Sequence, residues 1–80
     1  MTLREVVDKY LALSSGFGQP VELAKFGLDR AETERVFSVF DEDYHISRYF
    51  HLSRVSGETF EINGFPHTHV VIDPEVQSIL

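Results

Sequence analysis

Apolar residues near the N-terminus recur at the spacing of an α-helix. They fall at positions i, i+3, i+4, i+7 and i+8 and so share one helix face: Leu3, Val6, Val7, Tyr10 and Leu11. Thr2 and Glu5 fit the S/T-x-x-E capping box, in which each side chain accepts a hydrogen bond from the other residue's backbone. The pattern predicts a helix over residues 2–13.

Two further helices are predicted after a loop rich in glycine and serine. Pro20 suits the first turn of a short helix over residues 20–26, which Gly27 can end in a left-handed conformation. Asp29 is a good N-cap for a third helix over residues 30–43. The apolar residues expected on the buried side of this helix are Val36, Phe37, Phe40 and Tyr44.

From residue 46 onward, apolar and polar residues alternate with the period of a strand. Residues 46–55 and 59–63 predict a hairpin around Ser56-Gly57-Glu58. We expect Leu52 to pair with Ile62, because a slip of one residue would turn every side chain to the other face. The outward-facing side chains are then Tyr49, His51, Ser53, Glu61 and Asn63.

Shorter elements are predicted to complete the chain. A turn over residues 63–66 leads to a third strand or extended segment over residues 67–72, and a last helical turn covers residues 75–80. Eighty residues suffice for a single small core. The sequence therefore predicts one α+β domain, in which three helices are followed by a β-hairpin and a possible third strand.

The segment "PVELAKFGLDRAETERVFSVFDEDYHISR", Pro20 to Arg48, resembles the bacterial winged helix-turn-helix domain. It carries Leu23-Ala24 in the short helix, Gly27-Leu28 before the N-cap, and the acidic exit "FDEDYHI" into the strands. It departs from that family's pattern by one residue, because two residues separate Ala24 from Gly27 instead of three. The resemblance implies a single winged-helix-like domain over residues 1–80. It also implies DNA binding, with the third helix in the major groove and the hairpin tip on the backbone.

The charge distribution argues against that DNA-binding function. The chain has 13 acidic and 7 basic residues and a net charge of −6. Residues 29–43 hold two arginines and six carboxylates, a net −4 on the helix that would approach phosphates. DNA binding by a small transcriptional regulator therefore stays an alternative, and its candidate residues are Arg30, Arg35, Arg48 and Arg54.

The favoured interpretation is a non-catalytic protein–protein interaction domain of winged-helix shape. We expect contact with a protein partner, or self-association, through the acidic third helix and the outer face of the hairpin. The candidate interaction residues are Glu32, Glu34, Arg35, Asp41, Glu42 and Tyr49.

Outward-facing histidines raise a second alternative, a metal-binding module. His67 and His69 lie two residues apart and share one face of a strand, and His51 and Glu61 also face outward in the expected register. If a strand separates His51 from the pair, their backbones are roughly 10 Å apart. We therefore expect solvent-exposed histidines and no metal or other cofactor.

An enzyme is not expected. The chain has no cysteine, no Gly-x-Ser-x-Gly elbow and no phosphate-binding glycine loop in a strand-to-helix context. No apolar run approaches the roughly 20 residues of a membrane span. Glu5 and Asp8 interrupt the apolar stretch that a signal peptide would need. A cytoplasmic location is the resulting expectation.

Overall fold

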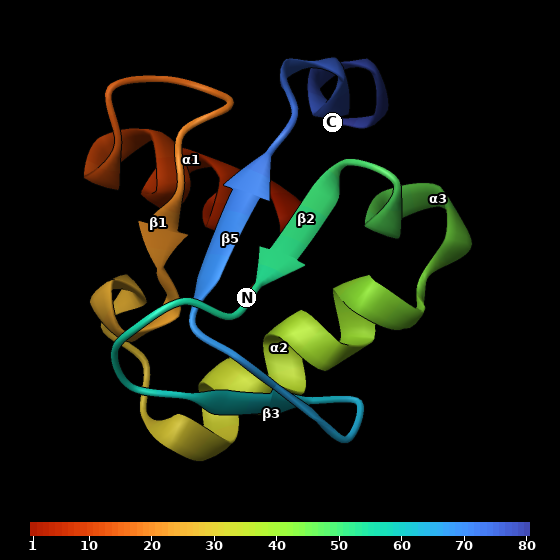
Figure 1. Ribbon diagram of the computed structural model, residues 1–80. Helices are drawn as coiled ribbons and strands as arrows, with labels where there is room; N and C mark the ends of the chain where they lie inside the picture. Colours follow the sequence, from red (N-terminus) through yellow and green to blue (C-terminus); the bar gives the residue numbers. More distant parts are fainter.

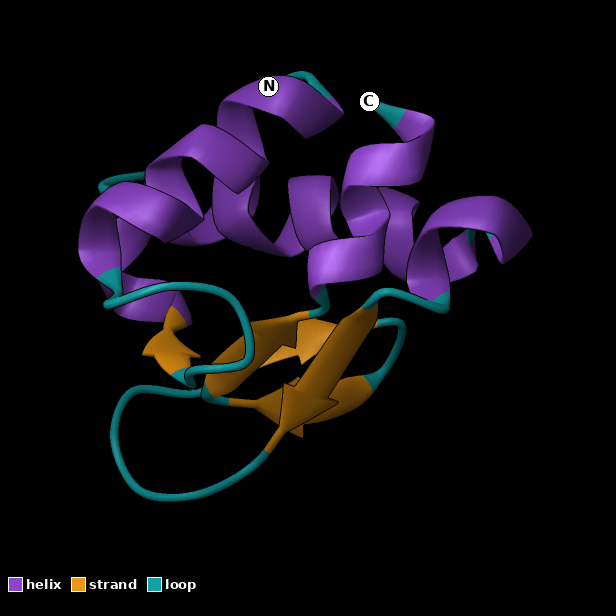
Figure 2. Cartoon of the chain, turned by 90° about the horizontal axis from the view of Figure 1, so that it is seen from above, coloured by secondary structure: helices purple, strands orange, loops and turns teal.

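A computed structural model describes residues 1–80 and shows helices packed against one face of a small sheet (Figure 1 and Figure 2). The elements, in chain order, are α1 (Leu3–Leu13), β1 (Val21–Glu22), the 3-10 helix η1 (Leu23–Phe26), α2 (Arg30–Glu42), α3 (Tyr44–Ser47), β2 (Phe50–Ser53), β3 (Phe60–Ile62), β4 (Phe65–His67), β5 (His69–Ile72) and the 3-10 helix η2 (Pro74–Ile79). The mixed α+β class is confirmed, with antiparallel strands in two small sheets.

The predicted first helix and its capping box are confirmed. The backbone N–H of Glu5 donates to Thr2 Oγ1 at 3.2 Å, and the N–H of Thr2 donates to Glu5 Oε1 at 2.8 Å. These bonds satisfy donors that the first turn of a helix leaves without partners. The apolar stripe of α1 is buried at Val6, Val7 and Tyr10 and packs into the core.

The predicted short helix over residues 20–26 is only partly present. Val21 and Glu22 form the strand β1, and a 3-10 turn follows. Val21 pairs with Val70 of β5, and the N–H of Leu23 donates to the carbonyl of Thr68 at 2.8 Å. These contacts hold the segment extended against the sheet. Gly27 ends the 3-10 turn in the left-handed conformation expected of it, with φ of 77°.

The predicted hairpin between residues 46–55 and 59–63 is wrong. β2 pairs with β5, so that Leu52 lies opposite Val70 and not opposite Ile62. β3 pairs instead with β4 through the two-residue turn Asn63-Gly64. Both turn residues are left-handed, with φ of 51° and 88°, which is the geometry preferred by tight hairpins. The result is a three-stranded sheet in the order β1-β5-β2 and a separate pair β3-β4.

The core lies between the helices and the inner face of the three-stranded sheet. Its centre is aromatic: Phe37 of α2 packs edge-on against Phe26 of η1, with ring centroids 5.2 Å apart, and Phe40 lies 5.5 Å from Phe50 of β2. Phe50 and Phe60 are both buried, and their neighbours His51 and Glu61 are exposed. The prediction that His51 and Glu61 face outward is therefore right, although the predicted pairing of the two strands is not. None of the helices has the length and apolar composition of a membrane span.

Candidate functional site

The helix α2 carries most of the candidate interaction residues, and its sequence explains how it is held. Asp29 caps it by accepting a hydrogen bond from the N–H of Glu32 at 2.7 Å, as predicted. One side of the helix is buried in the core through Thr33, Val36, Phe37 and Phe40. The other sides are polar, and the structure divides them into two surfaces with different roles.

The first polar side of α2 holds the β3-β4 hairpin. Glu34 accepts a hydrogen bond from the N–H of Glu61 at 2.7 Å, and Ser38 Oγ accepts one from the N–H of Asn63 at 3.3 Å. The Asn63 amide also donates to Asp41 Oδ2 at 2.9 Å. Two of the predicted interaction residues, Glu34 and Asp41, therefore bind the chain's own hairpin.

Arg30 extends this contact at the start of α2. Its guanidinium donates to the carbonyl of Thr59 and to Glu58, both at 2.6 Å. It also lies 4.9 Å from the centre of the Phe60 ring, which fits a cation–π contact. These contacts occupy donors of Arg30 that a phosphate would otherwise use.

The second polar side of α2 faces solvent. Its residues recur at a spacing of three and four: Glu32, Arg35, Val39 and Glu42. Arg35 donates to both carboxylate oxygens of Glu32, at 3.1 Å and 2.6 Å. Val39 is 53% exposed although it is apolar. Sequence reasoning did not single out Val39; the regular spacing of its neighbours was the signal for its outward position.

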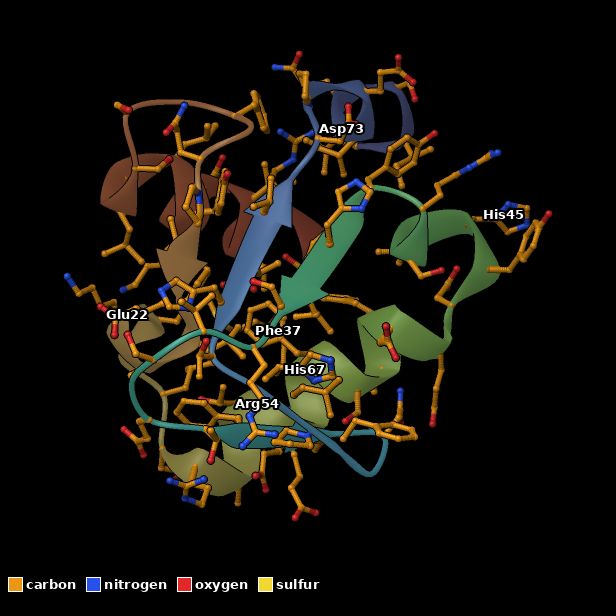
Figure 3. All side chains as sticks on the ribbon, viewed as in Figure 1. Glu22, Phe37, His45, Arg54, His67 and Asp73 are labelled. Carbon is orange, nitrogen blue, oxygen red and sulfur yellow. The ribbon has the colours of Figure 1, made fainter.

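Asp43 separates α2 from α3 and reverses one prediction. It ends α2 in an extended conformation, and its side chain accepts hydrogen bonds from the N–H groups of His45 and Ile46. Because a new helix starts here, the buried stripe of α2 does not continue to Tyr44. The prediction that Tyr44 is a core residue is wrong, since it is 78% exposed. Its ring packs edge-on against His45, which projects from the body of the molecule (Figure 3).

Tyr49 is also placed differently from the expectation that it faces outward. Its side chain is half-buried and packs against the core, and the guanidinium of Arg48 lies 5.9 Å from its ring. Of the six predicted interaction residues, Glu42 is therefore the exposed one that makes no side-chain bond within the chain.

The four arginines of the DNA-binding alternative have different surroundings. Arg30 and Arg35 are bound to carboxylates, as described above. Arg48 and Arg54 lie just beyond opposite ends of β2, and neither forms an ion pair. Half of the positive charge of the set is thus neutralised within the chain itself.

The candidate metal ligands do not form a site. His67 belongs to β4 and His69 to β5, and the buried residue Thr68 joins the two strands between them. His51 lies 4.0 Å from Asp73, which Figure 3 places far from His67. No group of three or more histidine or carboxylate side chains, with or without Glu61, converges on one point.

The expectation that His67 and His69 are solvent-exposed is wrong, because both are half-buried, and their environments differ. His69 Nδ1 lies 2.6 Å from the Thr68 hydroxyl, whereas His67 Nδ1 is buried without a hydrogen-bond partner. The structure contains no pocket.

Arg35 lowers the pKa of the Glu32 carboxyl group. Its hydrogen bonds, and then its charge, hold the pKa of Glu32 below the ordinary value for glutamate. The substitution Arg35→Met is expected to raise the Glu32 pKa toward that ordinary value, measured by NMR titration of the side-chain carboxyl. The matched change Arg4→Met on α1 should leave it unchanged.

The sign of the associated effect on stability follows from the direction of the shift. Because folding lowers the pKa of Glu32, the pair stabilises the fold above the pKa of the unfolded chain, and this contribution is lost as the pH falls through the folded pKa. An unchanged Glu32 titration in Arg35→Met would contradict the assigned cause.

No protein-family model matches this chain, and no match was found among curated proteins or solved structures.

Proposed function

We propose that this chain is a non-catalytic protein-binding module of winged-helix shape. Binding occurs through the solvent-facing side of α2 and the start of α3, a region called here the α2–α3 surface: Glu32, Arg35, Val39, Glu42 and Tyr44. The observation that carries the proposal is the exposure of two large apolar side chains there, Val39 at 53% and Tyr44 at 78%. Apolar side chains exposed among polar ones are typical of protein-binding surfaces.

The order of elements supports the winged-helix part of the proposal. A helix, a helical turn and a second long helix precede an antiparallel strand pair, β2-β5. Two features were not part of the predicted arrangement: the strand β1 before the helical turn and the β3-β4 hairpin inserted between the paired strands. Because this hairpin binds α2, the helix offers a partner only its second polar side.

Charge indicates the chemistry of the partner. Arg35 is bound to Glu32, whereas Glu42, at the end of α2, is exposed and makes no side-chain bond within the chain. A partner that presents an apolar side chain beside lysine or arginine fits this surface. Duplex DNA does not fit it, because the arginines of α2 are already bound to carboxylates.

The test is a comparison of two double variants in partner capture. Val39→Asp with Tyr44→Asp should abolish capture of the partner from a cell extract, and Leu13→Asp with Ala12→Asp, exposed on α1, should not. The protein captured would be identified by mass spectrometry, purified and titrated by calorimetry. We expect the affinity to fall by at least about tenfold in the first variant only, as for the loss of central contacts in an interface.

Two results would contradict the proposal. One is equal binding of the purified partner by both double variants. The other is micromolar binding of duplex DNA at low salt, measured by fluorescence anisotropy, which would favour the regulator alternative with Arg48 and Arg54 as its contacts.

A further inference from the structure

Three of the four strands at sheet edges are protected by an identifiable feature. β1 is only two residues long and follows Pro20 directly. On β3, the edge N–H of Glu61 is bonded to Glu34 of α2. β4 carries Pro66 opposite Glu61, so that the position facing away from β3 has no N–H to offer. Short strands, prolines and covering contacts are ways in which proteins prevent pairing at sheet edges.

β2 has no such protection. It pairs with β5 on one side, and no strand lies on its other side (Figure 1). The N–H of Asp73 donates to the carbonyl of Tyr49 at 2.9 Å, so these two residues form a hydrogen-bonded pair next to β2 and β5. Bonding between antiparallel strands alternates, so His51 bonds toward β5 and the backbone groups of Phe50 and Leu52 point to the open edge. The sequence of β2, "FHLS", contains neither proline nor a carboxylate.

The surroundings of this edge are basic, unlike the rest of this acidic chain. Arg48 precedes β2 and Arg54 follows it, both exposed and neither in an ion pair. His51, on the strand itself, is also exposed and has Asp73 as its neighbour at 4.0 Å. The two arginines therefore flank the stretch in which the backbone groups of Phe50 and Leu52 have no strand partner.

We propose that the open edge of β2 binds an extended acidic segment of a partner protein, which adds a fourth strand to the sheet. Main-chain hydrogen bonds to Phe50 and Leu52 hold the segment, and carboxylates near its two ends contact Arg48 and Arg54. The occupant is not a second copy of this chain, because antiparallel pairing of two β2 strands would bring Arg48 of one copy toward Arg54 of the other. This proposal concerns a different surface and a partner of opposite charge from the proposed function, so either can fail alone.

The test uses a fluorescein-labelled octapeptide with glutamate at each end and alternating valine and threonine between. Eight extended residues span about 27 Å. Arg48 lies in the helical turn before β2 and Arg54 directly follows the strand, so the stretch between them is shorter than the roughly 20 Å of six extended residues. At saturating peptide, NMR-detected hydrogen exchange should slow about tenfold or more at the amides of Phe50 and Leu52, and it should not change at His51, whose N–H is already in the ladder.

Variants and modified peptides separate backbone pairing from simple charge attraction. The double change Arg48→Glu and Arg54→Glu should weaken binding by about tenfold or more, and Arg54→Glu alone, which leaves the Arg48–Tyr49 contact in place, should weaken it in part. The control Arg4→Glu with Lys9→Glu alters the net charge equally on α1 and should leave binding unchanged. Of two peptides N-methylated at alternating residues in opposite phases, only one should lose binding, because only one set of N–H groups faces β2.

Each of the following results would overturn the proposal. The peptide fails to bind at millimolar concentration, or it binds without slowing exchange at Phe50 and Leu52. The α1 control weakens binding as much as the β2 variant. The Phe50 and Leu52 amides are slowed without peptide in a manner that depends on protein concentration, which would identify a second copy as the occupant.

Discussion

Replacing Phe37 with alanine is expected to lower the free energy of unfolding by about 3–5 kcal/mol. Phe37 is 1% exposed and joins the two layers of the fold, since it contacts Phe26 of η1 and Phe50 of β2, with ring centroids 5.2 Å and 6.4 Å away. Its removal leaves a cavity between helix and sheet in addition to the lost burial of the ring. A domain whose total stability is of order 5–15 kcal/mol loses a large share of it.

Urea denaturation followed by circular dichroism measures this change. The matched control is Val39→Ala on the same helix, two residues along and 53% exposed, which should change the free energy of unfolding by less than about 0.5 kcal/mol. Similar losses in the two variants would mean that Phe37 does not have the central position in the core described above.

Replacing Thr68 with valine is expected to cost about 1–3 kcal/mol, although the two side chains have nearly the same shape. Thr68 is 1% exposed, and its hydroxyl accepts a hydrogen bond from the N–H of Val55 at 2.8 Å and lies beside His69 Nδ1. Valine keeps the volume but leaves that N–H without its partner, at the point where β4 continues into β5.

The control for this prediction is Thr59→Val. Thr59 is exposed and its side chain makes no hydrogen bond, so its replacement should be neutral within about 0.5 kcal/mol. Faster amide exchange at Val55 in Thr68→Val, with unchanged exchange in α1, would locate the loss. Equal stability of Thr68→Val and the native chain would show that the hydroxyl contributes nothing to joining the strands.

Local signals in the sequence predict the helix ends well. The capping box at Thr2, the N-cap at Asp29 and the left-handed Gly27 each depend on residues within one turn, and all three are confirmed. Strand pairing was not predictable in the same way, because it depends on contacts between distant residues. β2 pairs with residues 69–72. The alternation of apolar and polar residues shows which side chains of β2 face inward, but it is compatible with several partner strands.

The candidate site was harder to predict than the fold class. Composition marked α2 as acidic, but which of its carboxylates are free depends on where the hairpin docks, and no local pattern specifies that. Glu34 and Asp41 therefore appeared available when they are not. The spacing of Tyr44 matched the buried side of α2, but α2 ends before it, at Asp43. Asp43 is both the C-cap of α2 and the N-cap of α3, and only these two roles together indicate that Tyr44 is exposed.

The attachment of the hairpin to α2 has a consequence for how this protein can evolve. A substitution at Glu34 or Ser38 disturbs the hairpin, and one at Val36 or Phe37 disturbs the core. Substitutions on this helix that leave the fold intact are therefore confined to its remaining side, which is the side proposed to bind a partner. Changes at Arg35 and Val39 can therefore alter which partner binds without altering the scaffold.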